Sequence, residues 1–101
     1  MKKIIMLLLF VIISSNAYAV KTCSGKISHV LDWPTKCDGN IAFRLDSVSG
    51  IWICTTTPKS EAMILTAFGA NKSVAVRLST EKTSCSDIEQ YHQPMYIYIV
   101  K

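Results

Sequence analysis

The sequence predicts a small β-rich α+β domain held together by two disulfides. Three observations support this expectation. Short segments of alternating apolar and polar residues, typical of half-buried strands, lie on both sides of one longer apolar segment with a helix cap. Four cysteines remain once a removable N-terminal leader is set aside. The remaining 82 residues (101 less a leader of 19) build only a thin core, so covalent support is expected.

Residues 1–19 are expected to be a signal peptide. Lys2 and Lys3 precede ten apolar residues, 4–13, and Ala17 and Ala19 form a small-x-small cleavage site. The apolar run is shorter than the about 20 residues that span a bilayer. We therefore expect one domain over residues 20–101, secreted or periplasmic and without a membrane anchor.

The charge of the mature chain is mild. Removing Lys2 and Lys3 leaves nine Lys and Arg against seven Asp and Glu, a net charge of +2. These charges are scattered singly, whereas proteins that bind nucleic acid concentrate theirs in a basic stripe. We therefore expect no nucleic-acid partner.

The four remaining cysteines predict two disulfides, because an even count in a short exported chain is typical of a disulfide framework. A metal site would need closely paired ligands such as Cys-x-x-Cys, and the sequence has none. Four cysteines allow three pairings, and the sequence does not choose among them. The pairing that we favour joins Cys37 to Cys54 within a hairpin and Cys23 to Cys85, which ties the first strand to a late loop.

Alternation predicts five strands, at residues 26–32, 41–46, 51–54, 73–78 and 95–100. In the first of them Ile27, His29 and Leu31 are expected to share one face. A polar loop, residues 79–93, separates the last two strands. In the last strand Met95, Ile97 and Ile99 are expected to face the core.

One helix is expected between the third and fourth strands. Thr57 can cap its N-terminus with Pro58 at the first position, where the missing amide costs nothing. Asn71 is a suitable C-terminal stop. Residues 62–70 are almost all apolar, so we expect a helix buried on more than one side, with a continuous core face made by Met63, Ile64, Ala67 and Phe68.

The resulting order is three strands, one helix and two strands. This is the element order of an OB-fold, a five-stranded, partly open barrel with a helix between strands three and four. The alternative is another small α+β sheet with the helix packed across one face. Periodicity cannot separate them, because both bury the same faces.

The mature N-terminus resembles that of a group of small, largely uncharacterised exported Gram-negative proteins. The similarity lies first in residues 23–27, Cys-Ser-Gly-Lys-Ile, and continues at 65–67, 72–76 and 84–88 with matching spacing along most of the mature chain. This resemblance implies export and brings almost no function with it.

A second resemblance concerns the helix and the strand after it. Residues 60–78 are similar to the corresponding part of the B subunits of pertussis-like and subtilase-type pentameric toxins. Those subunits are exported, disulfide-bonded OB-folds that bind cell-surface glycans and carry an enzymatic subunit. The similarity covers about a quarter of the mature chain and consists mainly of small and apolar residues. It supports the fold more than the activity, since no glycan-contacting motif can be placed here.

The sequence shows no catalytic or metal-binding pattern. A nucleophile needs a base and an orienting group. The cysteines are assigned to disulfides, and the only histidines are His29, expected to pack on a strand face, and His92, expected to be solvated. Asp87, Glu89 and His92 match no known ligand spacing. We therefore expect no enzyme, no metal and no cofactor.

The aromatic residues are the best indication of a binding surface. Aromatic rings offer flat apolar faces with a polar handle, which suits interfaces and sugar rings alike. We take Tyr96, Tyr98, Trp33 and Asp32 as the candidate ligand-binding residues. Further hydrogen bonds to a ligand are expected from Asn40 and Gln93.

These observations favour an exported, non-catalytic binding module. By its resemblance it would be a toxin B-subunit-like protein that binds a cell-surface glycan and assembles into a homo-oligomer, a pentamer, with an enzymatic subunit. The alternative is a periplasmic module that binds a protein, such as an inhibitor or immunity protein. A small secreted enzyme is the third interpretation.

Overall fold

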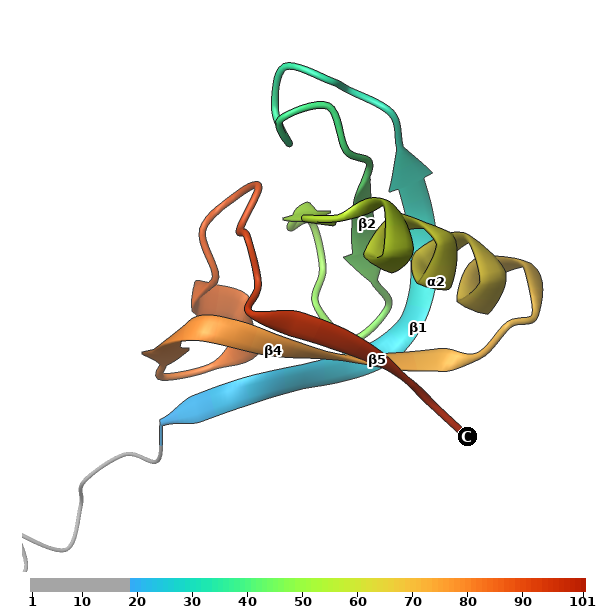
Figure 1. Cartoon of the computed structure of the whole chain (residues 1–101). Helices are drawn as coiled ribbons and strands as arrows, with labels where there is room; N and C mark the ends of the chain where they lie inside the picture. The colour runs from blue at the N-terminus through green and yellow to red at the C-terminus, as the bar shows by residue number, and fades with distance from the viewer. Residues whose placement is uncertain (1–18) are drawn as a thin grey trace, which may run out of the picture.

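The computed structural model describes residues 19–101, and the expected leader lies outside them except for Ala19. Five antiparallel strands form one sheet with the order β3-β2-β1-β4-β5. One helix, α2, and a short 3₁₀ turn, η1, complete the described part of the chain (Figure 1). The elements are β1 (Val20–Leu31), β2 (Ala42–Leu45), β3 (Ile53–Cys54), α2 (Pro58–Gly69), β4 (Ser73–Lys82), η1 (Cys85–Asp87) and β5 (Tyr96–Val100). The predicted β-rich α+β class and element order are confirmed.

The sheet is not closed, so a barrel is not confirmed. Strands β3 and β5 are its two edges. An isolated parallel bridge joins Ile53 of β3 to His92, which precedes β5, so the two ends of the sheet approach without forming a continuous ladder. The helix lies across one face of the sheet, where it contacts β1, β4 and β5 (Figure 1).

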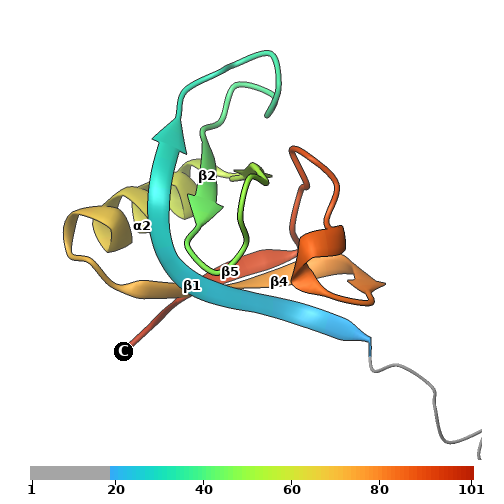
Figure 2. The same cartoon turned by 180° about the vertical axis from the view of Figure 1, so that it is seen from behind.

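Strand β1 is long and curved, and it belongs to both halves of the sheet (Figure 2). Its first part pairs with β4 and its second part with β2, with a bulge between Ile27 and His29. A bulge adds one residue and shifts the alternation of faces. Ile27 is therefore buried while His29 is exposed, and the expectation that the two share a buried face was wrong.

The cap of α2 follows from its sequence as expected. The Thr57 hydroxyl accepts a hydrogen bond from the Ser60 amide at 3.1 Å, and Ser60 Oγ accepts one from the Thr57 amide at 3.1 Å. Pro58 occupies the first helical position. At the other end, Asn71 adopts a φ of 55°, the left-handed conformation in which asparagine often ends a helix.

The helix is buried on one side only, which corrects the expected wide core face. Ile64 and Ala67 are buried, but Phe68 is 46% exposed and Leu65 is 49% exposed. The sheet offers one surface to α2, and no other described element covers the opposite side of the helix. Apolar composition alone therefore overestimated the burial of this helix.

Both disulfides form with the pairing that we favoured. Cys23 of β1 bonds to Cys85 of η1, and Cys37 bonds to Cys54 of β3. Cys23 belongs to the main core, whose large buried side chains include Phe43 and Leu45. Among residues 19–101, no helix is long and apolar enough to cross a membrane.

Candidate functional site

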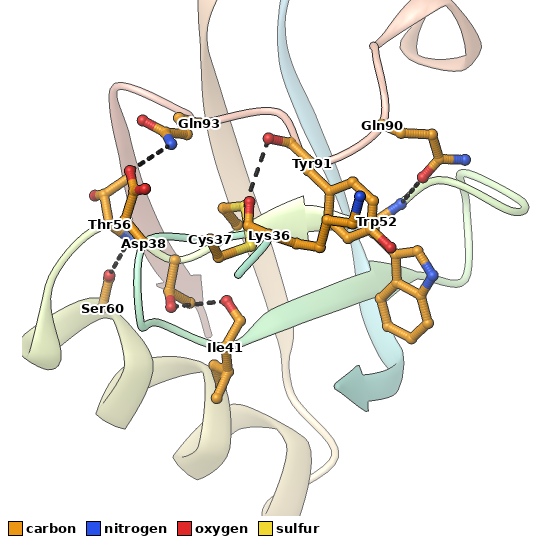
Figure 3. The surroundings of a disulfide bond; sticks show 12 residues. Lys36, Cys37, Asp38, Ile41, Trp52, Thr56, Ser60, Gln90, Tyr91 and Gln93 are labelled. Atoms are coloured by element: carbon orange, nitrogen blue, oxygen red, sulfur yellow. Dashed lines mark hydrogen bonds between the residues drawn. A yellow bond between two sulfur atoms is a disulfide. The ribbon is translucent and has the colours of Figure 1, made fainter. Parts of the chain in front are cut away.

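The Cys37–Cys54 disulfide organises a second, smaller cluster apart from the main core. Its buried members are Cys37, Cys54 and Ala42. Trp52, which directly precedes β3, and Tyr91, in the segment before β5, pack against it (Figure 3). The bond thereby brings the β1–β2 loop next to a segment more than fifty residues later in the sequence.

A small polar hollow of about 60 Å³ opens beside this disulfide. The residues that line it come from three segments: Cys37, Asp38, Asn40, Thr55, Thr56 and Gln93. Pockets that enclose a whole drug-sized ligand measure about 300–1,000 Å³. The hollow is therefore large enough for one polar group of a ligand, and the rest of that ligand would lie on the surface around it.

The polar side chains in the hollow are partly engaged with each other. Gln93 Nε2 donates a hydrogen bond to Asp38 Oδ2 at 3.2 Å, which holds the two loops together (Figure 3). Thr55 Oγ1 donates to the Ile41 carbonyl at 2.9 Å. The Asn40 side chain makes no hydrogen bond to any residue within 19–101. An amide that the surrounding protein leaves unpaired is a suitable donor and acceptor for a ligand.

The backbone around the hollow is held in an unusual conformation. Asp38 has a φ of 53° and Tyr91 has a φ of 60°, which are two of the three non-glycine residues with positive φ in the described chain. A left-handed tyrosine is uncommon and costs about 1–3 kcal/mol, and such residues cluster at functional sites. Hydrogen bonds from the Tyr91 amide to the Trp52 carbonyl (2.7 Å) and from the Cys54 amide to the His92 carbonyl (2.8 Å) hold this segment.

Aromatic rings and cations surround the disulfide. Trp33 and Tyr91 meet edge to face with 6.5 Å between ring centroids. Lys36 Nζ lies 5.4 Å from the Trp33 centroid and 5.5 Å from that of Tyr91, within the range of cation–π attraction. The lysine therefore helps to hold both rings at the surface, where Trp33 is 47% exposed.

A second aromatic–cation group lies on the outer side of β1, β2 and β3. The Arg44 guanidinium stacks over Trp52 with 4.2 Å to the ring centroid, and the His29 ring meets the same indole at 6.4 Å. Arg44 Nε is buried without a hydrogen-bond partner among the described residues. Stacking on Trp52 holds the Arg44 side chain in place. His29, Arg44 and Trp52 therefore form a second aromatic group on the sheet, besides Trp33 and Tyr91.

The structure separates the predicted ligand-binding residues into two places. Trp33 and its exposed neighbour Asp32 lie in the β1–β2 loop, which supplies three of the residues that line the hollow, but neither Trp33 nor Asp32 lines it. Tyr96 and Tyr98 lie on the edge strand β5, with 6.2 Å between their ring centroids. No hydrogen bond or ring contact links the two pairs within the described part of the chain. The expected contributors Asn40 and Gln93 do line the hollow.

Sequence reasoning missed the parts of the site that depend on contacts between distant segments. Lys36 was not singled out because an isolated lysine in a loop has no pattern. Its position next to Cys37 could have drawn attention to it, because a disulfide in a hairpin holds the residues beside each cysteine close to the sheet. Asp38 was assigned only to a turn, Asp38-Gly39-Asn40, and the turn was right.

His92 is buried, which corrects the expectation that it is solvated. The residue is 1% exposed. Its Nδ1 lies 2.9 Å from Glu89 Oε1, and its Nε2 accepts a hydrogen bond from the Ser79 amide at 3.4 Å. His92 thus holds the segment that carries Tyr91 and Gln93 against β3 and β4.

Ser79, His92 and Glu89 have the order of a nucleophile, its base and an orienting acid. However, Ser79 Oγ lies 3.5 Å from His92 Nε2, beyond the about 2.6–3.2 Å typical of an activated hydroxyl. The same nitrogen already accepts the Ser79 amide. We therefore assign this group a positioning role, and the absence of enzymatic activity stays a prediction. No group of three metal-ligating side chains is found within residues 19–101.

Glu89 gives the site a pH dependence. The Lys82 ammonium, 2.8 Å from Glu89 Oε2, and then the His92 ring lower the pKa of this carboxyl from 4.5 to about 2. Between these two pH values the unfolded chain binds a proton that the folded chain does not. The contribution of Glu89 to stability is therefore complete above pH 4.5 and is lost as the pH falls toward 2.

We expect Glu89→Gln to lower the melting temperature at neutral pH, and the difference from the unmodified protein to shrink steadily below pH 4.5. Glu81→Gln is the matched control, because Glu81 also pairs with a lysine, Lys21, but contacts no buried histidine. Thermal unfolding followed by circular dichroism from pH 7 to pH 2 measures both. A difference that is constant with pH would contradict the ion-pair explanation.

Comparisons with known proteins leave the function to be argued from this site. No protein-family model matches the chain, and a search of curated proteins returns no match. The resemblances of the sequence therefore remain predictions.

Proposed function

We propose that this protein is an exported, non-catalytic binding module that recognises a glycan at the surface around the Cys37–Cys54 disulfide. One observation supports this most directly: the exposed Trp33 ring, fixed by Tyr91 and Lys36, belongs to the same loop that forms a polar hollow with Gln93. Aromatic rings bind the apolar face of a sugar, and amide and carboxylate groups orient its hydroxyls.

The dimensions of the site favour a surface-bound oligosaccharide. The hollow of about 60 Å³ accepts one substituent. Flat contact would come from Trp33, in the loop that forms the hollow, and from Tyr91, two residues before Gln93. The loops are held in place before any ligand arrives, by the disulfide and by the Asp38–Gln93 hydrogen bond. A rigid site loses little conformational entropy on binding.

The compartment belongs to the same proposal. Two disulfides fit an oxidising environment, and secretion or periplasmic location is proposed from the expected leader. Assembly as a toxin-like B subunit with an enzymatic partner is a further proposal, which is supported only by the resemblance of residues 60–78. The pentameric ring of such toxins and the dimer proposed below exclude each other, and the mass of the protein in solution distinguishes them.

The test is a glycan array probed with the mature protein, followed by titration of the best ligand. We expect Trp33→Ala and Gln93→Ala each to weaken binding at least tenfold, equivalent to about 1.4 kcal/mol, with little change in melting temperature. The double substitution Tyr96→Ser and Tyr98→Ser is the control, since it removes rings of similar exposure from β5 instead of from the β1–β2 loop. Both variants are compared by titration with a monovalent ligand in solution, where loss of the dimer proposed below does not change the affinity of a single site. Binding lost in the tyrosine variant and kept in the Trp33 variant would move the site to β5.

A protein ligand is the second candidate, because the hollow is small and the surrounding surface is broad and aromatic. Aromatic residues are enriched at protein interfaces as well as at sugar sites. A blank array together with one protein that co-purifies and is lost with Trp33→Ala would favour an inhibitor or immunity protein. The same variant therefore tests both candidates.

A further inference from the structure

Strand β5 is an edge without the usual protection. It pairs with β4 on one side, and no described strand pairs with its other side. Its five residues, Tyr-Ile-Tyr-Ile-Val, include no charge and no proline. Natural proteins guard exposed edges with lysine, proline or bulges, because an open edge is a template for another strand.

The exposed apolar side chains of the protein concentrate at this edge. Of the eight large hydrophobic residues that are exposed within residues 19–101, five belong to β5 or directly precede it: Met95, Tyr96, Tyr98, Ile99 and Val100. Two more, Leu65 and Phe68, lie on α2, which packs against β5. Such a concentration of exposed apolar surface indicates an interaction site.

We propose that β5 pairs antiparallel with β5 of a second copy of this chain, so that two sheets join in an isologous dimer. The partner must supply an extended, uncharged edge. The other edge of the sheet, β3, has only two residues, and His92 already bridges its Ile53. The partly open stretches of β1 and β4 carry charges, Lys21 and Lys26 on β1 and Glu81 and Lys82 on β4. Within the described chain, β5 is therefore the open edge that is both extended and uncharged.

The register follows from the two-fold symmetry. Centring the pair on Tyr98 places Tyr96 opposite Val100 and Ile97 opposite Ile99. Aromatic and β-branched residues are favourable cross-strand neighbours. The two Lys101 residues then lie at opposite ends of the seam, about 20 Å apart at about 3.4 Å per residue, which is beyond the range of repulsion in physiological salt.

The helix enlarges this contact. A specific interface buries about 800 Å² on each partner, which is more than a five-residue strand supplies. In an antiparallel pair of edges the two-fold axis is perpendicular to the sheet, so the α2 helices of both copies lie on the same side. The joined sheet therefore brings the exposed Phe68 and Leu65 of both copies to one surface beside the seam.

This interface does not depend on the proposed glycan site. In Figure 1 the β1–β2 loop lies at the top, and β5 runs below it to the C-terminus. The segment before β5 reaches this loop through Gln93, but no residue of β5 itself lines the hollow, so pairing through β5 leaves the hollow open. Two sites on one particle increase the apparent affinity for a surface that carries many copies of a ligand.

The test is the mass of the mature protein in solution, measured by light scattering over a range of concentrations. We expect a dimer that dissociates on dilution. Tyr98→Lys is expected to give a folded monomer, because the two-fold axis places the two lysines opposite each other. Trp33→Lys is the matched control and should remain a dimer, because Trp33 and Tyr98 are both 47% exposed.

Mixing two variants of opposite charge is the stricter test of the register. Tyr98→Lys and Tyr98→Glu chains are each expected to be monomeric alone and to form a mixed dimer together, since position 98 faces itself across the axis. A monomeric unmodified protein, a ring with an odd number of copies, a dimer that survives Tyr98→Lys, or folded chains that fail to pair when mixed would each overturn the proposal. Even if a variant does not fold, a monomeric mass for the unmodified protein would still overturn the dimer.

Discussion

Replacing Phe43 by alanine is expected to destabilise the protein by about 3–5 kcal/mol, the usual cost of removing a fully buried phenylalanine. Phe43 is 0% exposed and lies on β2 within the main core. A small domain has a total stability of about 5–15 kcal/mol. The loss should lower the melting temperature by about 12 °C or more.

Phe68→Ala is the matched control for this experiment. Apolar periodicity predicts that Phe68 is as important as Phe43, whereas the structure leaves it 46% exposed on α2. We expect a change within about 0.5 kcal/mol, as for most surface positions. Both variants are to be compared by urea unfolding at low protein concentration, where association contributes least. Equal losses would show that α2 is covered on both sides.

Removing the Cys23–Cys85 disulfide is expected to cost more than removing Cys37–Cys54. The first closes a separation of 62 residues and the second a separation of 17. By the loop-entropy relation these correspond to about 4 and about 3 kcal/mol. Their sum is comparable with the whole stability of a small domain, so loss of both should unfold the protein.

Paired alanine substitutions, Cys23 with Cys85 and Cys37 with Cys54, avoid unpaired thiols. Urea midpoints give the two costs, and reduction of the unmodified protein gives the combined effect. A reduced protein that keeps its midpoint would show that the core alone maintains the fold. A larger loss for the Cys37–Cys54 pair would show that the smaller cluster around it stabilises more than the length of its loop implies.

Local sequence patterns predicted the elements and the ends of the helix well, whereas β1 begins six residues before and β4 ends four residues after the predicted bounds. The Thr57 cap, Pro58 at the first helical position and the stop at Asn71 depend on a few neighbouring residues, and the structure has all three. Alternation likewise placed Val74, Val76 and Leu78 on the buried face of β4. Such features are local, so one stretch of sequence suffices to specify them.

The same patterns failed where one extra residue or one missing neighbour decides the outcome. The bulge after Ile27 turned His29 outward, and alternation has no means to show a bulge. Met95, Ile97 and Ile99 were expected to share one buried face. Ile97 is only 9% exposed, but Met95 is 61% exposed and Ile99 is 38% exposed, because no strand lies beyond β5. Burial depends on what covers a face, and that is a property of the whole fold.

The sequence by itself determined the β-rich class, the helix between the third and fourth strands, the order of the elements along the chain and the presence of two disulfides. Only the tertiary structure decided that the sheet stays open and that Tyr91 and Gln93 meet the Trp33 loop. It also decided that His92 is the buried link holding them there. The physical reason is separation: the contacts from Tyr91 and Gln93 to the Trp33 loop join residues more than fifty positions apart. No local preference encodes where two distant loops will meet.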